Sequence, residues 1–240
     1  MAIRTITASP LMSIAGSVSG ASSASRRGTE KWRTVISATL LICIFSFSSI
    51  KVHGQTAFMS ADEVEQFGGN HLFDQQGYRV DNYRSPTPVR IEGITTVDTQ
   101  ALDALMTSEP DLVIVDVINL TFQNDRFLID KPHQAIVGAH WLPNTGQGDL
   151  ELRWEQYLLD EVQRLTEGNN RRPVVVACKS DCWLSWNVSL RLYNAGYRSL
   201  YWYRNGVDTW MASGRPVETV EPVKPVFAKS PGDKSSNNNF

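Results

Sequence analysis

Cys178 and Cys182 are the residues of this 240-residue sequence whose type and spacing best suit chemistry. Cys178 follows the aliphatic run 174–177, and Cys182 lies four residues later, in a loop that also holds Lys179, Ser180 and Asp181. Backbone N–H groups of a tight strand-to-helix loop form an anion-binding nest, and the partial positive charge of a helix N-terminus favours a thiolate. Thiols in such positions are the reactive ones. We therefore predict a functional pair rather than two inert thiols or a structural disulfide.

Metal binding by the two cysteines is a weaker hypothesis. Two thiolates four residues apart need further ligands to hold copper or zinc. The histidines His71, His133 and His140 do not cluster with the pair along the sequence, and the Cys-x-x-Cys-His motif of covalent haem is absent. We predict no metal and no cofactor.

The segments around the cysteine loop alternate between strand and helix patterns. Strands are predicted at 93–97, 112–117, 136–142, 174–177 and 199–203. Apolar residues at helical spacing predict helices after Asp98, over 152–166 and between the cysteine loop and Gly196. This alternation predicts an α/β fold with a central, mostly parallel sheet. Functional loops of such sheets lie beyond the carboxyl ends of the strands, which is where Cys178 is expected.

The flanks of this predicted domain, residues 93–218, differ from it in composition. Segment 55–92 is polar and interrupted by glycine and proline, so we expect extended structure with short turns, and Arg79, Asp81 and Arg84 on its surface. Segment 219–240 has few residues to bury and is expected to be a disordered tail.

The N-terminal residues 1–54 have the pattern of a secretory signal peptide. Arg26, Arg27, Lys31 and Arg33 precede the uncharged segment 35–50, and small residues follow it. An uncleaved membrane anchor is the alternative, but this segment has only sixteen residues, four of them serine, where a bilayer needs about 20 apolar residues. We predict cleavage and a periplasmic protein, which would retain only Cys178 and Cys182 in a compartment that permits disulfides.

Charge excludes one class of partner. Residues 55–240 carry 17 basic and 24 acidic side chains, a net charge of -7. Nucleic-acid binding requires a basic face, so we predict no nucleic acid as partner, and a membrane only through an uncleaved signal segment.

Several motifs, in order, resemble a rhodanese-like domain. They are Val113-Ile114-Val115-Asp116, Ile136-Val137-Gly138-Ala139, the strand that leads to Cys178, and the run from Tyr203 through Trp210 to Gly214-Arg215-Pro216-Val217. The resemblance covers about residues 93–218 and implies a rhodanese-like three-layer fold in which Cys178 carries a persulfide. It also implies that Asp116 supports the loop from beneath by hydrogen bonding. An equal alternative is that Asp116 is a strand-end acid in water.

A narrower resemblance begins earlier in the chain. Asp181-Cys182-Trp183 with Ser185-Trp186-Asn187, Gly77-Tyr78-Arg79 and Trp141-Leu142-Pro143-Asn144 are similar to motifs of secreted Cys-Trp proteins associated with pyrroloquinoline quinone (PQQ)-dependent alcohol catabolism. This resemblance implies a periplasmic quinone-dependent dehydrogenase or cytochrome as partner.

The cysteine loop departs from ordinary rhodaneses in ways that disfavour thiosulfate. It is about one residue longer and contains Cys182, Trp183 stands about where many members have arginine, and Asp181 adds a negative charge. Lys179 is the only cation of the loop. Trp183 is expected to cover the loop and exclude water, whereas Trp186 and Trp210 are expected in the core.

Three hypotheses for function follow. In the first, Cys178 and Cys182 perform thiol–disulfide exchange, with Cys182 as the resolving thiol. In the second, Cys178 transfers a sulfane sulfur, as the rhodanese resemblance implies. In the third, the altered loop is a non-catalytic docking module for a dehydrogenase or cytochrome. We favour the first.

Overall fold

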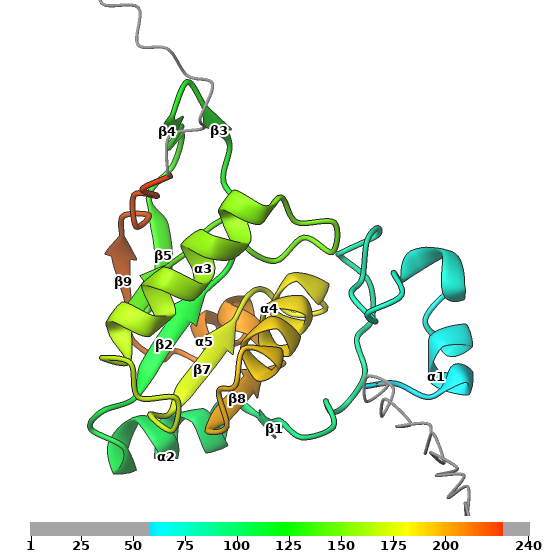
Figure 1. The fold of residues 1–240 in the computed structure, drawn as a ribbon. Helices are drawn as coiled ribbons and strands as arrows, with labels where there is room; N and C mark the ends of the chain where they lie inside the picture. Colours follow the sequence, from blue (N-terminus) through cyan, green and yellow to red (C-terminus); the bar gives the residue numbers. More distant parts are fainter. Residues whose placement is uncertain (1–57, 228–240) are drawn as a thin grey trace, which may run out of the picture. The chain divides into compact units, whose positions relative to one another are not determined.

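A five-stranded parallel sheet forms the centre of the computed structural model, which describes residues 58–227 (Figure 1). The described residues all belong to one of the chain's two compact units, Lys51–Phe240. The strand order is β1-β8-β7-β2-β6, and every neighbouring pair is parallel. The strands are β1 Thr95–Val97, β2 Val113–Asp116, β6 Ala139–Trp141, β7 Val174–Ala177 and β8 Leu200–Tyr203. The predicted α/β fold is confirmed.

Helices cover both faces of this sheet. Helices α3 (Leu152–Leu165) and α4 (Trp183–Asn194) pack on one face, and α2 (Thr99–Ser108) and α5 (Gly206–Ala212) pack on the other (Figure 1). Alternate residues of β7 therefore enter different cores: Val174 and Val176 join the α3–α4 side, and Val175 joins the α2–α5 side. Burial on both faces explains why the central strands are continuously aliphatic.

The carboxyl ends of all five strands lie in one row. The pairing places Val97 beside Tyr203, Tyr203 beside Ala177, Ala177 beside Asp116, and Asp116 beside Trp141. Cys178 follows Ala177 directly and so leaves the sheet at this edge. The predicted position of the cysteine loop is confirmed.

The predicted strand 136–142 is two strands. Strand β5 (His133–Ile136) pairs antiparallel with β9 (Val217–Val220), and only β6 joins the central sheet. Gly138, at φ 81°, turns the chain between β5 and β6. The sequence predicted one strand over 136–142 because this run is mostly apolar and a single glycine can also lie inside a strand. The two remaining short strands, β3 (Phe122–Gln123) and β4 (Arg126–Phe127), pair with each other.

The segment before the sheet is not simply extended. It contains helix α1 (Ala61–Gln66) and the 3-10 helix η1 (Asn70–Leu72). Ser60 and Glu63 form a reciprocal capping box, in which the Ser60 hydroxyl accepts from the Glu63 N–H and the Glu63 carboxylate accepts from the Ser60 N–H. This Ser-x-x-Glu pattern is a recognised helix start, and it was the missed signal.

The boundary expected at residue 218 falls inside β9, which runs to Val220. Beyond it, the Val223 N–H donates to the Trp141 carbonyl at 2.9 Å, and Phe227 packs edge-on against Trp154. The first part of the expected tail is therefore ordered against the domain, and residues 228–240 lie outside the described residues. The predicted signal peptide, 1–54, also lies outside them. Among residues 58–227 no helix is long and apolar enough to cross a membrane.

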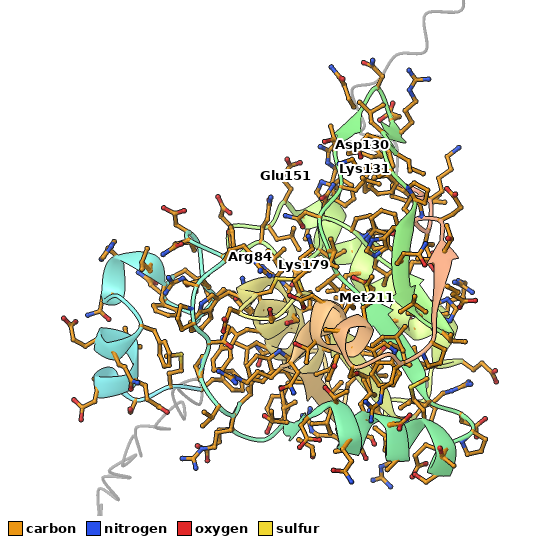
Figure 2. The ribbon with its side chains drawn as sticks, turned by 180° about the vertical axis from the view of Figure 1, so that it is seen from behind. Arg84, Asp130, Lys131, Glu151, Lys179 and Met211 are labelled. Carbon is orange, nitrogen blue, oxygen red and sulfur yellow. A yellow bond between two sulfur atoms is a disulfide. The ribbon has the colours of Figure 1, made fainter. Side chains whose placement is uncertain are left out.

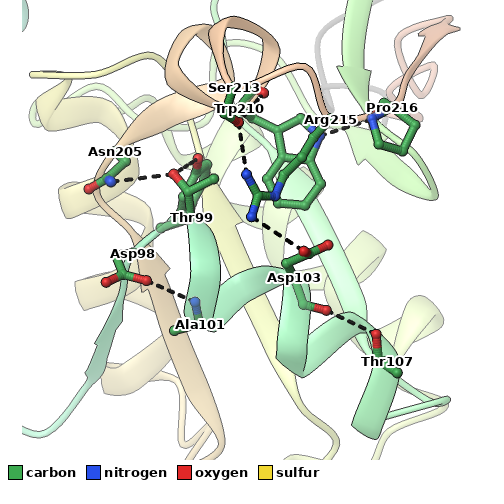
Figure 3. A network of polar contacts seen from close by, with 11 residues as sticks. Asp98, Thr99, Ala101, Asp103, Thr107, Asn205, Trp210, Ser213, Arg215 and Pro216 are labelled. Carbon is green, nitrogen blue, oxygen red and sulfur yellow. Dashed lines mark hydrogen bonds and ion pairs between the residues drawn. The ribbon is translucent and has the colours of Figure 1, made fainter.

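Polar contacts fix helix α5 to the end of the sheet and to α2 (Figure 3). The Asn205 amide donates to the Thr99 hydroxyl at 3.4 Å, and that hydroxyl also bonds the Tyr203 hydroxyl at 2.9 Å. After α5, Arg215 pairs with Asp103 at 3.3 Å. Trp210 is buried and its ring packs edge-on against Tyr203, so its predicted position in the core is confirmed. Helix α5 is thus held at both ends beside the carboxyl edge of β8.

Asn187 of α4 joins the N-terminal segment to the domain. Its side chain is fully buried, accepts from the Arg79 N–H and donates to the carbonyls of Arg79 and Gly146, each at 2.8 Å. Asn187→Ala is expected to lower the free energy of unfolding by about 3 kcal/mol, because it leaves buried backbone groups without partners. Urea unfolding measures this, with Asn194→Ala, on the same helix but exposed, as the control at about 0.5 kcal/mol or less. Equal losses in the two variants would contradict this role.

Candidate active site

Cys178 and Cys182 are joined by a disulfide across the loop between β7 and α4. Cys178 is the first residue after the strand, and Cys182 is the N-cap residue of α4. Their Cα atoms are 6.2 Å apart, and each residue is 2% exposed. Between them, Lys179 and Asp181 are exposed, and Asp181 adopts a left-handed backbone with φ 47°. The two sulfurs therefore lie beneath a loop whose charged side chains are exposed.

Helix α5 holds this loop from one side. The Val207 N–H donates to the Cys178 carbonyl at 2.8 Å. Asp208 accepts twice from Ser180: from its backbone N–H at 2.7 Å and from its hydroxyl at 2.6 Å. Gly206, at φ 81°, lies so close to the Lys179–Ser180 peptide that a Cβ atom there would overlap its backbone. The loop and the first turn of α5 form one packed unit.

The N-terminal segment holds the loop from the other side. Arg84 forms an isolated antiparallel bridge with Cys182, and the Trp183 N–H donates to the Tyr83 carbonyl at 2.9 Å. The Arg84 guanidinium donates to the Ser180 carbonyl at 2.5 Å. Figure 2 shows Arg84 and Lys179 beside each other on the face to which α5 contributes the exposed Met211. Segment 83–85 therefore forms part of the site, although sequence analysis placed Arg84 only on the surface.

Trp183 does not cover the loop as an exposed lid. It is fully buried, its indole N–H donates to the Ser85 hydroxyl at 3.0 Å, and its ring meets Phe67 and Phe73 edge-on. The Arg79 guanidinium lies 4.8 Å from the centre of the same ring. The indole is thus the anchor on which the N-terminal segment docks.

Arg79 is 1% exposed, so its predicted surface position is wrong. Its guanidinium donates to the carbonyls of Phe67 and Asp81, both at 2.7 Å. Contact with aromatic faces and backbone carbonyls offsets the cost of burying this cation. Burial lowers the pKa of Arg79.

Asp116 is fully buried at the end of β2, which excludes the alternative of an acid in water. One carboxylate oxygen accepts from the Ile118 N–H at 2.9 Å, and the other lies 2.8 Å from His133 Nε2. The His133 ring stacks on Trp141 with centroids 4.0 Å apart. Asp116 therefore connects the chain just after β2, the strand beside β7, to His133 on β5, and its carboxylate bonds neither residue of the cysteine pair nor the loop between them.

The charge of Asp208 makes its hold on the loop dependent on pH. Burial raises the pKa of Asp208, but the hydrogen bonds from the Ser180 hydroxyl and N–H lower it by more, and the net pKa lies below its usual value. A lowered pKa stabilises the folded state above the unfolded value of about 3.9, and this stabilisation is lost as the pH falls through the folded value. We expect the stability gap between wild type and Asp208→Asn to be fully present above the unfolded pKa of about 3.9 and to narrow as the pH falls below it. Urea unfolding at several pH values tests this, and a gap that stays constant from neutral to acidic pH would contradict it.

Comparison with known protein families gives one match to the part of the chain that contains this loop. The family model "Rhodanese-like domain" matches residues 98–213, which include both cysteines, Asp116 and Asp208. Residues 98–213 have the rhodanese fold. No curated protein matches the chain significantly.

Solved structures similar to the chain include three described as sulfur-transfer or rhodanese-like proteins. One is the thiosulfate sulfurtransferase from Pseudomonas aeruginosa, with 20% identity over 54% of this chain, 21% of that chain and a TM-score of 0.37. Another is the polysulfide-sulfur transferase homodimer from Wolinella succinogenes, with 15% identity over 52% of this chain, 79% of that chain and a TM-score of 0.35. The third is the rhodanese-like domain of the Anabaena sp. Alr3790 protein, with 22% identity over 60% of this chain, 95% of that chain and a TM-score of 0.36. The chain spans about a fifth of the length of the Pseudomonas structure.

Within the rhodanese-like domain, the structure brings together Cys178, Lys179, Ser180, Asp181 and Cys182 in one loop, with Trp183 buried at its end. Sequence analysis missed Asp208, Gly206 and Arg84 as site residues. The motif containing Gly206 and Asp208 was visible before Trp210, but only the fold shows that its helix starts against the loop. Within residues 58–227, no group of three or more histidine, cysteine or acidic side chains is placed to hold a metal ion.

Proposed function

We propose that the Cys178–Cys182 pair performs thiol–disulfide exchange with a partner dithiol. The observation that carries this proposal is the disulfide itself, formed within the loop between β7 and the N-terminus of α4. Two cysteines four residues apart close a short loop, so their disulfide stabilises the chain less than one that closes a long loop. A thiol at a helix N-terminus ionises readily and is therefore suited to exchange.

The proposed reaction has two steps. A partner thiolate attacks Cys178 Sγ, the Cys178–Cys182 bond breaks, and Cys182 leaves as a thiolate at the N-terminus of α4, where the helix dipole stabilises it. The partner's second thiolate then attacks the partner sulfur of the mixed disulfide and releases Cys178 as a thiolate. The partner dithiol loses two electrons and becomes a disulfide, and the Cys178–Cys182 disulfide gains two electrons and, with two protons, becomes a dithiol.

Sulfane-sulfur transfer is the second candidate, supported by the rhodanese-like family match across both cysteines. Here a Cys178 thiolate takes a sulfur atom from a donor and becomes a persulfide. If the Cys182 thiolate then attacks Cys178 Sγ, hydrosulfide leaves and the same Cys178–Cys182 disulfide forms. Both chemistries therefore use the same pair, but only the second passes through a persulfide.

Intact-mass spectrometry of the native protein, alkylated before and after reduction, tests the proposal. Exchange predicts a chain lighter by two hydrogen atoms than the dithiol form, and alkylation at Cys178 and Cys182 only after reduction. An additional sulfur atom on the Cys178 peptide would replace exchange by sulfane transfer. Two free thiols would contradict both and favour the non-catalytic docking module.

The compartment and partner are part of the same proposal. The signal pattern of residues 1–54 and the resemblance to secreted Cys-Trp proteins support a periplasmic protein whose partner is a quinone-dependent dehydrogenase or cytochrome. Cell fractionation and crosslinking through a Cys182→Ser variant would test both, because its Cys178 thiolate attacks the disulfide of the oxidised partner, releases one partner thiolate and, without Cys182, retains the partner as a mixed disulfide. Recovery of the processed chain from the cytoplasm would contradict the compartment.

A further inference from the structure

Two hydrogen-bond donors of the cysteine loop are already bound by a carboxylate of the protein. Ser180, in the middle of the loop, donates both its N–H and its hydroxyl to the two carboxylate oxygens of Asp208, at 2.7 and 2.6 Å. We propose that Asp208 occupies the place of an anionic substrate and makes the cysteine pair selective for thiols and disulfides over sulfur oxyanions such as thiosulfate. This inference rests on the proposed function and names its substrate class.

The carboxylate is rigidly placed. It belongs to the first turn of α5, next to Gly206, whose backbone packs directly on the Lys179–Ser180 peptide. Asn205 precedes that turn and is bonded to Thr99 (Figure 3). Hydrogen bonds to an ionised carboxylate are about twice as strong as those between neutral groups. An oxyanion that binds to Ser180 would therefore have to break both hydrogen bonds to Asp208, and α5, which is packed on the loop, holds Asp208 in place.

Other donors around the loop are also engaged within the chain. At the start of the loop, the Val207 N–H donates to the Cys178 carbonyl. At its end, the Trp183 N–H donates to the Tyr83 carbonyl. The Arg84 guanidinium donates to the Ser180 carbonyl. These three donors are therefore bound to acceptors of the protein.

The local charge points the same way. Asp208 and the exposed Asp181 bring two negative charges to the loop, against Lys179 and Arg84. The two carboxylates offset the two cations, so the loop offers a thiosulfate dianion no net positive charge. A protein thiol that ionises only as it attacks does not require such a charge.

Sulfite release from thiosulfate by the fully reduced protein tests this assignment. In that reaction the Cys178 thiolate attacks the sulfane sulfur, the S–S bond of thiosulfate breaks, and sulfite leaves with the electron pair, which leaves a Cys178 persulfide. Wild type is expected to release sulfite slowly, and Asp208→Asn to release it about tenfold faster or more, because the variant removes the negative charge and weakens its two hydrogen bonds. Circular dichroism and urea unfolding establish that each variant is folded.

Asp181→Asn is the matched control, because it also removes one negative charge from an exposed side chain near the loop, but Asp181 accepts none of the hydrogen bonds from Ser180. It is expected to raise the rate by about twofold at most, because it leaves both Ser180–Asp208 hydrogen bonds in place and the charge that it removes is screened. Equal acceleration by Asp181→Asn and Asp208→Asn would overturn the assignment, as would fast sulfite release by wild type or an unchanged rate in Asp208→Asn. These results are distinct from a failure of the proposed thiol–disulfide exchange. That failure would be seen without thiosulfate, in the reduction and oxidation of Cys178 and Cys182 in the wild-type protein.

Discussion

Replacing Gly206 with alanine is expected to lower the free energy of unfolding by about 3–5 kcal/mol. Two costs add at this position. Gly206 has φ 81°, a conformation that an L-residue adopts only with strain. An added Cβ would also overlap backbone atoms of Lys179 and Ser180, which cannot move aside as a flexible side chain can. The loop would be displaced from α5, and the hydrogen bonds from Ser180 to Asp208 would break.

Gly214→Ala separates the two costs. Gly214 has a similar φ of 74°, but nothing lies within 4 Å of the position of its Cβ. Its replacement is expected to cost about 1 kcal/mol, from backbone strain alone. Urea unfolding of both variants measures the difference. If Gly206→Ala were no more destabilising than Gly214→Ala, the close packing of the loop on α5 would be refuted.

Substitution of either cysteine by serine is expected to reduce the rate of catalysed exchange by about three orders of magnitude or more. The two variants should fail differently. Cys182→Ser keeps the Cys178 thiol, which can attack a partner disulfide and release one partner thiolate, but it has no second thiol to resolve the product, so it should accumulate a mixed disulfide with an oxidised partner. Cys178→Ser should form little mixed disulfide. Gel shift under non-reducing conditions and intact mass distinguish the two patterns.

Loss of the disulfide also affects stability, and this contribution must be separated. Closing so short a loop stabilises the fold by about 2 kcal/mol in the chain-entropy account. The reduced wild-type protein is the appropriate control, because it lacks the same bond and keeps both thiols. Normal exchange by the Cys178→Ser/Cys182→Ser double variant, with cellular function retained, would contradict catalysis and support the docking module.

The sequence predicted the elements that local pattern determines. Continuous aliphatic residues at 113–115 and 174–177 marked the central strands, because burial on both sheet faces favours apolar residues there. The stripes of α3 and α4 and the position of Cys178 followed from the same periodicity. In the site, the five residues from Cys178 to Cys182 could be predicted because they are consecutive.

The features that sequence did not predict depend on contacts between distant segments. Arg79 is charged and was expected in solvent, but Trp183 and Phe73, far from each other in the chain, make a buried position favourable for it. Asp208 lies 28 residues from Ser180 and reaches the loop only because β7 and β8 are neighbours. No local pattern distinguishes this carboxylate from an ordinary acid in the first turn of a helix.

The most direct test of the account is a redox titration of the wild-type protein in dithiothreitol buffers, with alkylation and mass analysis at each ratio. Exchange predicts that Cys178 and Cys182 are reduced together in one two-electron transition, with a tenfold change in the ratio of reduced to oxidised protein for about 30 mV and a midpoint above about −300 mV. The protein should remain folded throughout. A pair that stays oxidised until the protein unfolds would show a structural disulfide and contradict the account.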